Sequence, residues 1–212
     1  MALKYQTNKM KKFIIFDFDG VIVDSKKNME LSWKKVQTDL QIKVGFKRYF
    51  KKIGMPFENI LDSLNVKKKY TTKAKNIYRK QSIKNFNKIR LYPDVLKTLN
   101  ILKKKNYLLG MITSKEKIRT EKLLKKFKLE FQYVYCPVAG KKGKPDPYMM
   151  NTLIKKEKIN KANVYYIGDT LTDYKFAKNS KVQFIYCKYG YGNLKHKNLK
   201  IANKFKEVLK YI

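Results

Sequence analysis

The stretch Phe-Ile-Ile-Phe-Asp-Phe-Asp-Gly-Val-Ile-Val-Asp-Ser, residues 13–25, decides the fold. It begins with four consecutive apolar residues, Phe13 to Phe16, and a continuous apolar run is typical of a strand buried on both faces of a parallel sheet. Asp17 and Asp19 follow directly. Side chains alternate along an extended chain, so the two carboxylates can share one face, and Gly20 permits a tight turn just beyond them. The stretch therefore predicts a buried strand that ends in a pair of acids.

Further apolar runs alternate with helical patterns along the rest of the chain. Strands are expected at residues 107–112, 133–135, 164–167 and 182–186. Helices are expected at residues 94–104, 115–127, 147–157 and 172–179. This alternation predicts an α/β fold, a Rossmann-like parallel sheet with helices on both faces.

One long segment breaks the alternation. Residues 25–90 contain no strand-like run and are typical of several amphipathic helices, with a break around Gly54 and Pro56. We therefore expect an α/β core formed by residues 11–24 and 91–212, and an inserted all-helical cap formed by residues 25–90. An insert after the first strand stands over the carboxyl end of the sheet, where ligands bind in open α/β folds. Residues 1–10 are polar and are expected to form a tail.

The charge balance is extreme. The chain has 212 residues and a formal net charge of +35, which first suggests nucleic acid as a partner. However, all but four of the basic residues are lysines spread along the whole chain, and arginine is the residue that suits base readout and bidentate phosphate binding. We expect a solvated lysine surface and no nucleic-acid partner, with a functional polyanion surface as the alternative.

Other features narrow the class of protein. No apolar run approaches the roughly 18–20 residues of a membrane span, and the first residues lack the apolar segment of a signal peptide. Cys136 and Cys187 lie far apart, with no partner at zinc-ligand spacing, and are expected to be reduced. These features predict a cytoplasmic protein without a membrane anchor. The single histidine, His196, lies in a Lys- and Asn-rich segment, so carboxylates are the better candidates for catalysis.

The scarce acids gather at two strand ends. Asp17, Asp19 and Asp24 fall within eight residues, and Asp169 and Asp173 fall within five. Neighbouring carboxylates repel each other unless a cation lies between them, and Mg²⁺ prefers oxygen ligands. The two clusters therefore predict a Mg²⁺ site.

Three further segments carry chemistry. Asp17 and Asp19 can supply a nucleophile and a general acid if one is ionised and the other protonated. The alternative is that Asp19 and Gly20 form an ordinary turn, which would have the same sequence. Thr113 and Ser114 follow an apolar run, where a hydroxyl and helix amides can hold a phosphate oxygen or simply cap the helix. Lys144 lies in Lys-Pro-Asp-Pro, where the following proline fixes its position.

The order of these motifs resembles a known family. Asp-x-Asp-Gly-Val, Thr-Ser, Lys-Pro-Asp-Pro and Gly-Asp-Thr-Leu-Thr-Asp occur in the order found in the haloacid dehalogenase superfamily. The resemblance is to the phosphoglycolate-phosphatase and β-phosphoglucomutase-like branch, which has a helical cap, and it covers residues 11 to about 192. One departure is Pro93-Asp94, where the family usually has Pro-Gly.

The resemblance implies a role for each matching residue. Asp17 would be the nucleophile that forms a phosphoaspartyl intermediate, and Asp19 the acid and base that serves the leaving oxygen and then water. Thr113 and Ser114 would bind the transferring phosphoryl group. Lys144 would neutralise the nucleophile and the phosphate.

The same resemblance implies a cofactor, Mg²⁺. Asp17, Asp169 and the main-chain carbonyl of Asp19 would be its ligands. Asp173 would be a further ligand or would support the others.

The cap is expected to choose the substrate. Its candidate residues lie at the interhelical break: Arg48, Lys52, Gly54 and Met55. The resemblance implies a Mg²⁺-dependent phosphatase that hydrolyses a small phosphorylated metabolite. The alternatives are a β-phosphoglucomutase-like phosphosugar mutase, a basic nucleic-acid-binding protein and a polynucleotide-end phosphatase.

Overall fold

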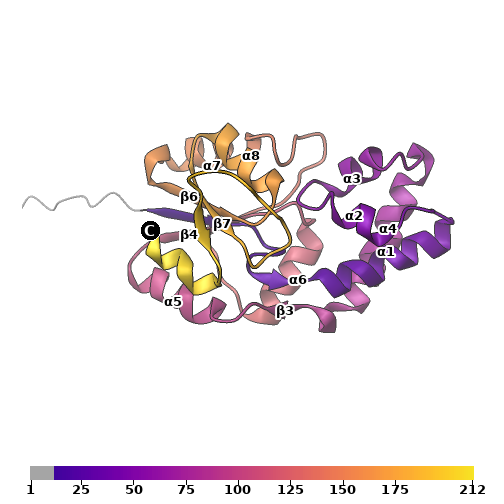
Figure 1. Ribbon diagram of the computed structural model, residues 1–212, viewed down its shortest axis with the longest axis horizontal. Helices are drawn as coiled ribbons and strands as arrows, with labels where there is room; N and C mark the ends of the chain where they lie inside the picture. Colours follow the sequence, from indigo (N-terminus) through magenta and orange to yellow (C-terminus); the bar gives the residue numbers. More distant parts are fainter. Residues whose placement is uncertain (1–11) are drawn as a thin grey trace, which may run out of the picture.

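A sheet with helices on both faces forms one part of the molecule, and a block of helices forms the other (Figure 1). The structure is a computed structural model, and it describes residues 12–212. The polar tail expected over residues 1–10 therefore lies outside the described residues, as does residue 11.

All strands of the main sheet run parallel, in the order β5-β4-β1-β6-β7-β8. Their bounds are Phe13–Phe16 (β1), Leu108–Ile112 (β4), Tyr133–Tyr135 (β5), Val164–Gly168 (β6), Gln183–Cys187 (β7) and Lys200–Ala202 (β8). The central strand is β1, because Phe16 is paired with Met111 of β4 on one side and with Ile167 of β6 on the other. The carboxyl ends of these three strands therefore meet at one edge.

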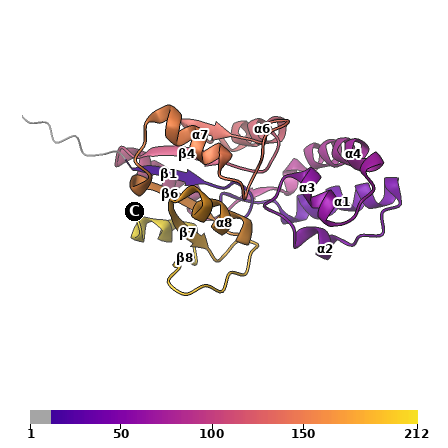
Figure 2. The same cartoon turned by 90° about the horizontal axis from the view of Figure 1, so that it is seen from above.

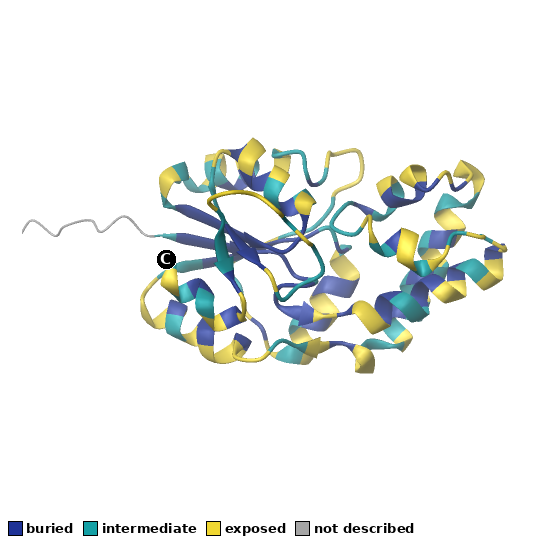
Figure 3. Cartoon of the chain, viewed as in Figure 1, coloured by how far each residue is buried: buried dark blue, intermediate teal, exposed yellow. Residues whose placement is uncertain are grey.

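Helices cover both faces of this sheet. They are α5 (Val95–Lys104), α6 (Lys117–Phe127), α7 (Tyr148–Glu157) and α8 (Leu171–Ser180). Ile14 and Phe16 pack into the core beneath α5 and α6, whereas Phe13 and Ile15 pack beneath α7 and α8. Figure 3 shows the sheet buried and the outer helix surfaces exposed. These observations confirm the predicted Rossmann-like fold.

Two details differ from the sequence-based expectations. The edge strand β8 and the 3-10 helix Phe205–Lys210 were not predicted, because the three residues Lys-Ile-Ala carry no apolar run. Asp94, which stands where the resembling family has glycine, adopts φ 64° just before α5. That left-handed conformation favours glycine but is open to aspartate.

The inserted helices have a core of their own. They are α1 (Lys26–Leu40), α2 (Phe46–Phe50), α3 (Phe57–Ser63) and α4 (Thr71–Lys84), with 3-10 turns at Lys68–Tyr70 and Phe86–Lys88. Trp33 is fully buried, stacks on Tyr49 at 4.5 Å between ring centroids, and donates from Nε1 to the carbonyl oxygen of Val44 at 2.7 Å. This separate cluster of aromatic and aliphatic residues explains why the helical block stands as a unit at the end of the sheet (Figure 2).

The chain enters and leaves the helical block through a short two-stranded ribbon. Strand β2 (Val23–Asp24) pairs antiparallel with β3 (Arg90–Leu91). We propose that core and cap divide at this ribbon, which lies at the expected boundaries of the segment 25–90.

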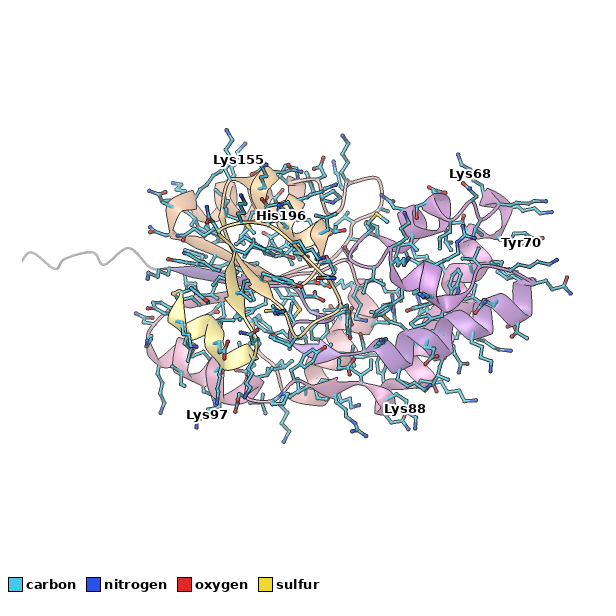
Figure 4. The ribbon with its side chains drawn as sticks, viewed as in Figure 1. Lys68, Tyr70, Lys88, Lys97, Lys155 and His196 are labelled. Carbon is cyan, nitrogen blue, oxygen red and sulfur yellow. The ribbon has the colours of Figure 1, made fainter. Side chains whose placement is uncertain are left out.

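Lysines cover the outside of both parts. Those labelled in Figure 4 are exposed and come from the cap and from the core: Lys68, Lys88, Lys97 and Lys155. They point outward at separate places, which is the arrangement expected of a solvated surface. None of the described helices has the length and apolarity that a membrane span needs.

Candidate active site

Three buried carboxylates converge at the carboxyl edge of the sheet. Asp17 follows β1, and its backbone N–H donates a hydrogen bond to the carbonyl oxygen of Ile167 at 2.8 Å. This bond extends the pairing of β1 with β6 to the residue after the strand. Asp169 follows β6, and Asp173 lies in the first turn of α8. Oxygen atoms of Asp17, Asp169 and Asp173 lie within 4.8 Å of one another. Asp17 of the first acidic cluster in the sequence thus meets both acids of the second cluster in space.

Lys144 is the counter-charge within this cluster. It is fully buried, and its Nζ lies 2.9 Å from Asp17 Oδ1 and 2.7 Å from Asp173 Oδ1. Nζ also donates to the hydroxyl of Tyr166 at 3.0 Å. Burial lowers the pKa of Lys144, but Asp17 and Asp173 outweigh it and raise the pKa above its ordinary value. Lys144 is therefore charged.

One lysine does not balance three acids. Burial raises the pKa of Asp17 to about 7; Lys144 opposes this rise and Asp173 adds to it. Burial, together with the charges of Asp173 and Asp17, raises the pKa of Asp169 well above its ordinary value. These shifts indicate that the cluster is short of positive charge and suited to a cation.

The atoms around Asp169 fit such a cation. Oδ2 accepts from the backbone N–H of Tyr191 at 2.6 Å, whereas Oδ1 is buried without a hydrogen-bond partner among the described residues. Gly20 adopts φ 84°, and a Cβ there would lie 2.1 Å from Asp169 Oδ2, so only glycine lets the backbone approach so closely. A buried, unpaired carboxylate oxygen beside Asp17 is the donor that a hard cation such as Mg²⁺ requires.

Asp173 differs from Asp169, because both of its carboxylate oxygens accept hydrogen bonds. Its Oδ1 accepts from Lys144 and from the hydroxyl of Tyr166 at 3.1 Å. Its Oδ2 accepts from the backbone N–H of Thr170 at 3.0 Å and from Thr170 Oγ1 at 2.6 Å, which caps α8. Both oxygens thus already have donors, and the arrangement favours support of Lys144 over direct metal ligation by Asp173.

Asp19 is held at the entrance to the cluster. Its Oδ1 accepts from Ser25 Oγ at 2.5 Å, and its Oδ2 lies 3.0 Å from Lys115 Nζ. Burial lowers the pKa of Lys115, an effect that Asp19 opposes. Sequence reasoning missed Lys115, because a lysine after Thr-Ser does not stand out in so lysine-rich a chain.

The two hydroxyl residues after β4 have different surroundings. Thr113 is buried and its Oγ1 accepts from the backbone N–H of Lys115 at 3.1 Å. Ser114 instead donates from Oγ to the carbonyl oxygen of Gly54 at 2.6 Å, so it ties the core to the cap. Gly54 adopts φ 93°, and a Cβ there would lie 2.7 Å from Thr170 Oγ1.

A small cavity of about 60 Å³ lies between the acids and the cap. On the core side it is lined by Asp17, Asp19, Thr113, Ser114, Lys115, Arg119 and Thr170. On the cap side it is lined by Met29, Tyr49, Ile53, Gly54, Met55, Phe57, Ile60 and Tyr78. The cap thus supplies a largely apolar wall, and the core supplies the charged groups.

Two of the four cap residues expected at the site lie elsewhere. Gly54 and Met55 line the cavity, but Arg48 and Lys52 are exposed and are absent from its lining. Helix α2 turns Tyr49 inward, and successive helical residues are rotated by roughly 100°, so Arg48 faces away. Lys52 lies in the turn that follows the helix.

Tyr191, in the loop between β7 and β8, links these parts and was not predicted. Its backbone N–H binds Asp169, and its hydroxyl accepts from the backbone N–H of Ser25 at 2.6 Å. Its ring lies 5.2 Å from that of Phe50 in the cap. The flanking glycine Gly190 allows this approach, since a Cβ there would lie 2.4 Å from Asp169 Cβ. The Gly-Tyr-Gly sequence was the available signal.

The fold and the site together define an α/β protein with an inserted helical block and with buried carboxylates gathered at the strand ends. The family model described as haloacid dehalogenase-like hydrolase matches residues 14–187. The chain therefore belongs to the haloacid dehalogenase-like hydrolases, which confirms the family that the four ordered motifs predict.

Several known proteins resemble the chain over most of its length. Phosphoglycolate phosphatase of Aquifex aeolicus is 27% identical over 194 residues, which cover 86% of this chain and 87% of that protein. Glyceraldehyde 3-phosphate phosphatase of Pyrococcus furiosus is 25% identical over 218 residues, which cover 95% and 88%. A haloacid dehalogenase-like family protein from Streptococcus pneumoniae shares the fold, with a TM-score of 0.81 and 22% identity over 95% of this chain and 98% of that chain.

Proposed function

We propose that the protein is a Mg²⁺-dependent phosphatase that hydrolyses a small phosphomonoester through a phosphoaspartyl intermediate on Asp17. The observation that carries the proposal is the buried cluster of Asp17 and Asp169 beside Lys144, with one oxygen of Asp169 unpaired. Relatives named as phosphatases of phosphoglycolate and of glyceraldehyde 3-phosphate support a small phosphorylated substrate.

The metal site would be built from the chain's own oxygens. Asp17, Asp169 and the main-chain carbonyl of Asp19 would hold Mg²⁺. When bound, the ion supplies the positive charge that lets a carboxylate approach a phosphate dianion. Asp173 would act by holding Lys144.

The chemical steps then fall to two aspartates. A carboxylate oxygen of Asp17 attacks phosphorus, the bond from phosphorus to the substrate's ester oxygen breaks, and Asp19 donates a proton to that oxygen. Asp19 next takes a proton from water, whose oxygen attacks phosphorus and releases inorganic phosphate and the free Asp17 carboxylate. Lys144 stays charged beside Asp17 and offsets the negative charge that gathers there.

Thr113 would bind a phosphoryl oxygen, since it is buried on the cavity wall at the end of β4. The small cavity and the apolar cap wall favour a metabolite over a polymer. We also propose that the protein works in the cytoplasm, where its two free cysteines stay reduced, and that nucleic acid is not its partner.

The first test is phosphate release by the purified protein from p-nitrophenyl phosphate and a panel of phosphorylated metabolites. Mg²⁺ should support turnover, and chelation should lower the rate by about 100-fold or more, because the carboxylate cluster then lacks its cation. Activity that is indifferent to chelation would contradict the metal role. With β-glucose 1-phosphate, free phosphate as product indicates a hydrolase, whereas glucose 6-phosphate indicates the mutase.

Tyr191→Phe is expected to lower kcat by about fivefold to tenfold while KM changes little. The substitution removes the hydroxyl that accepts a hydrogen bond from the backbone of Ser25, and the side chain of Ser25 in turn positions Asp19. Because one hydrogen bond contributes about 1 kcal/mol, its loss corresponds to a rate effect of this size. It keeps the ring against Phe50 and the backbone N–H that binds Asp169. Steady-state kinetics measures the effect. Tyr148→Phe on the exposed start of α7 is the matched control, and an equal loss of kcat in both variants would refute a positioning role.

A further inference from the structure

Three oxygen atoms lie around the ammonium group of Lys144, and one of them belongs to an uncharged side chain. Nζ lies 2.9 Å from Asp17 Oδ1 and 2.7 Å from Asp173 Oδ1, and it donates to the hydroxyl oxygen of Tyr166 at 3.0 Å. An ammonium group has three N–H donors. The three oxygens thus match the donors of Lys144 in number, and together they set where its charge lies beside Asp17.

Tyr166 reaches Lys144 from the middle of strand β6. Its backbone is paired with Ile15 of β1 on one side and with Phe184 of β7 on the other. The side chain is fully buried, and its ring meets that of Phe176 of α8 edge-on, with 5.0 Å between the ring centres. Because sheet and helix both hold the ring, the position of the hydroxyl at its end is fixed as well.

The hydroxyl of Tyr166 has acceptors of its own besides its contact with Lys144. It lies 3.1 Å from Asp173 Oδ1 and 3.2 Å from the carbonyl oxygen of Ile112, the last residue of β4, and it can donate its one proton to either. Burial, together with the charges of Asp173 and Asp17, raises the pKa of Tyr166 well above its ordinary value, so the hydroxyl keeps this proton. While it donates to one of these oxygens, its lone pairs remain available to Lys144.

We propose that Tyr166 is a positioning residue for the reaction, and that its hydroxyl holds the Lys144 ammonium against Asp17. The proposal rests on the proposed phosphatase function and adds a residue to it. Asp17 lines the small cavity, whereas Tyr166 is absent from the lining, so the hydroxyl acts through Lys144 and not on the substrate. The alternative is a packing role, which the ring of Tyr166 would fulfil without the hydroxyl.

Tyr166→Phe keeps the ring and removes only the hydroxyl. It should lower kcat by about tenfold or more, because a hydrogen bond to a charged group is lost, and should change KM by less than about twofold. Steady-state hydrolysis of p-nitrophenyl phosphate with Mg²⁺ measures both constants. Tyr165→Phe is the matched control and should retain the wild-type kcat, since Tyr165 neighbours Tyr166 on β6 but packs on the opposite face of the sheet. A wild-type kcat in Tyr166→Phe overturns the proposal.

A double-mutant cycle shows whether the hydroxyl of Tyr166 acts through Lys144. Lys144→Met removes the ammonium that the hydroxyl is proposed to hold. In that background, adding Tyr166→Phe should lower kcat by less than about twofold further, because residues that act as one unit are not additive. A general distortion of the strand ends would instead lower kcat by the same factor in both backgrounds, and that result overturns the proposal.

A readout without turnover separates this proposal from the proposed function. In a ¹⁵N-edited NMR spectrum of the wild-type protein, the Lys144 ammonium should give a signal that is missing from Lys144→Met, because burial and three neighbouring oxygens slow its exchange with water. The signal should shift or broaden in Tyr166→Phe but not in Tyr165→Phe. Its absence from the wild-type spectrum, or an unchanged signal in Tyr166→Phe, overturns the proposal. An absence of Mg²⁺-dependent hydrolysis of every substrate would instead overturn the proposed function.

Discussion

Asp17→Asn is expected to lower kcat by about 10⁴-fold or more, because loss of a covalent nucleophile has effects of this order. The amide has nearly the shape of the carboxylate, so it still fits between Lys144 and the strand end. However, its nitrogen and oxygen cannot attack phosphorus to form the aspartyl phosphate. Steady-state phosphate release measures the loss. Asp62→Asn, an exposed position on α3, is the control and should retain wild-type activity.

The same variant has a second, thermodynamic readout. The pKa of Asp17 is raised to about 7, mainly by burial. A carboxyl with a raised pKa stabilises the fold fully at low pH, and this contribution is lost as the pH rises through the folded pKa. Without Mg²⁺, the wild-type Tm should therefore fall relative to that of Asp17→Asn between about pH 4 and about pH 7. A variant that instead loses stability relative to wild type over this range would contradict the burial argument.

Lys144→Met is expected to impair both activity and stability. The substitution leaves Asp17 and Asp173 buried without their counter-charge, and breaking a buried pair in this way costs about 3–5 kcal/mol. For a chain of this length the loss corresponds to a decrease in Tm of about 10 °C. We expect kcat to fall by about 10³-fold, as for loss of a preorganised charge beside the reacting group.

Thermal unfolding and steady-state kinetics test this prediction. Lys142→Met is the control, since Lys142 lies in the same segment and is exposed, with Asp146 3.8 Å away. It should change stability by less than about 0.5 kcal/mol. If Lys144→Met unfolded at the wild-type temperature, the charge balance described for the cluster would be incorrect.

The features that the sequence predicts well are local ones. An apolar run followed by Asp-Phe-Asp-Gly predicts both the central strand and the acids at its end, because side-chain alternation and burial act within a few residues. The meeting of Asp17 with Asp169 follows from the rule that parallel strands end at the same edge. The capping interaction of Thr170 with Asp173 is also local, and it shows why the second acid of Gly-Asp-Thr-Leu-Thr-Asp is fully engaged.

The features that escaped prediction depend on distant partners. Tyr191 binds Ser25 across 166 positions of the chain, and no pattern near either residue indicates the contact. Lys115 is one lysine among many, and only its burial against Asp19 distinguishes it. The orientation of α2 is set by the packing of Tyr49 in the cap core, so the exposure of Arg48 cannot be inferred from its position beside the Gly54 break.

The two-stranded ribbon of β2 and β3 has a consequence for how such an enzyme diversifies. Since the helical block begins and ends at adjacent points, one contiguous stretch of gene could be exchanged without altering the end of β1 that holds Asp17 or the loop before α7 that holds Lys144. An exchange would replace the apolar wall but would leave Arg119, which belongs to the core. Descendants with new caps would then keep the buried acids and the lysine between them, while the shape of the cavity wall that faces them was free to change.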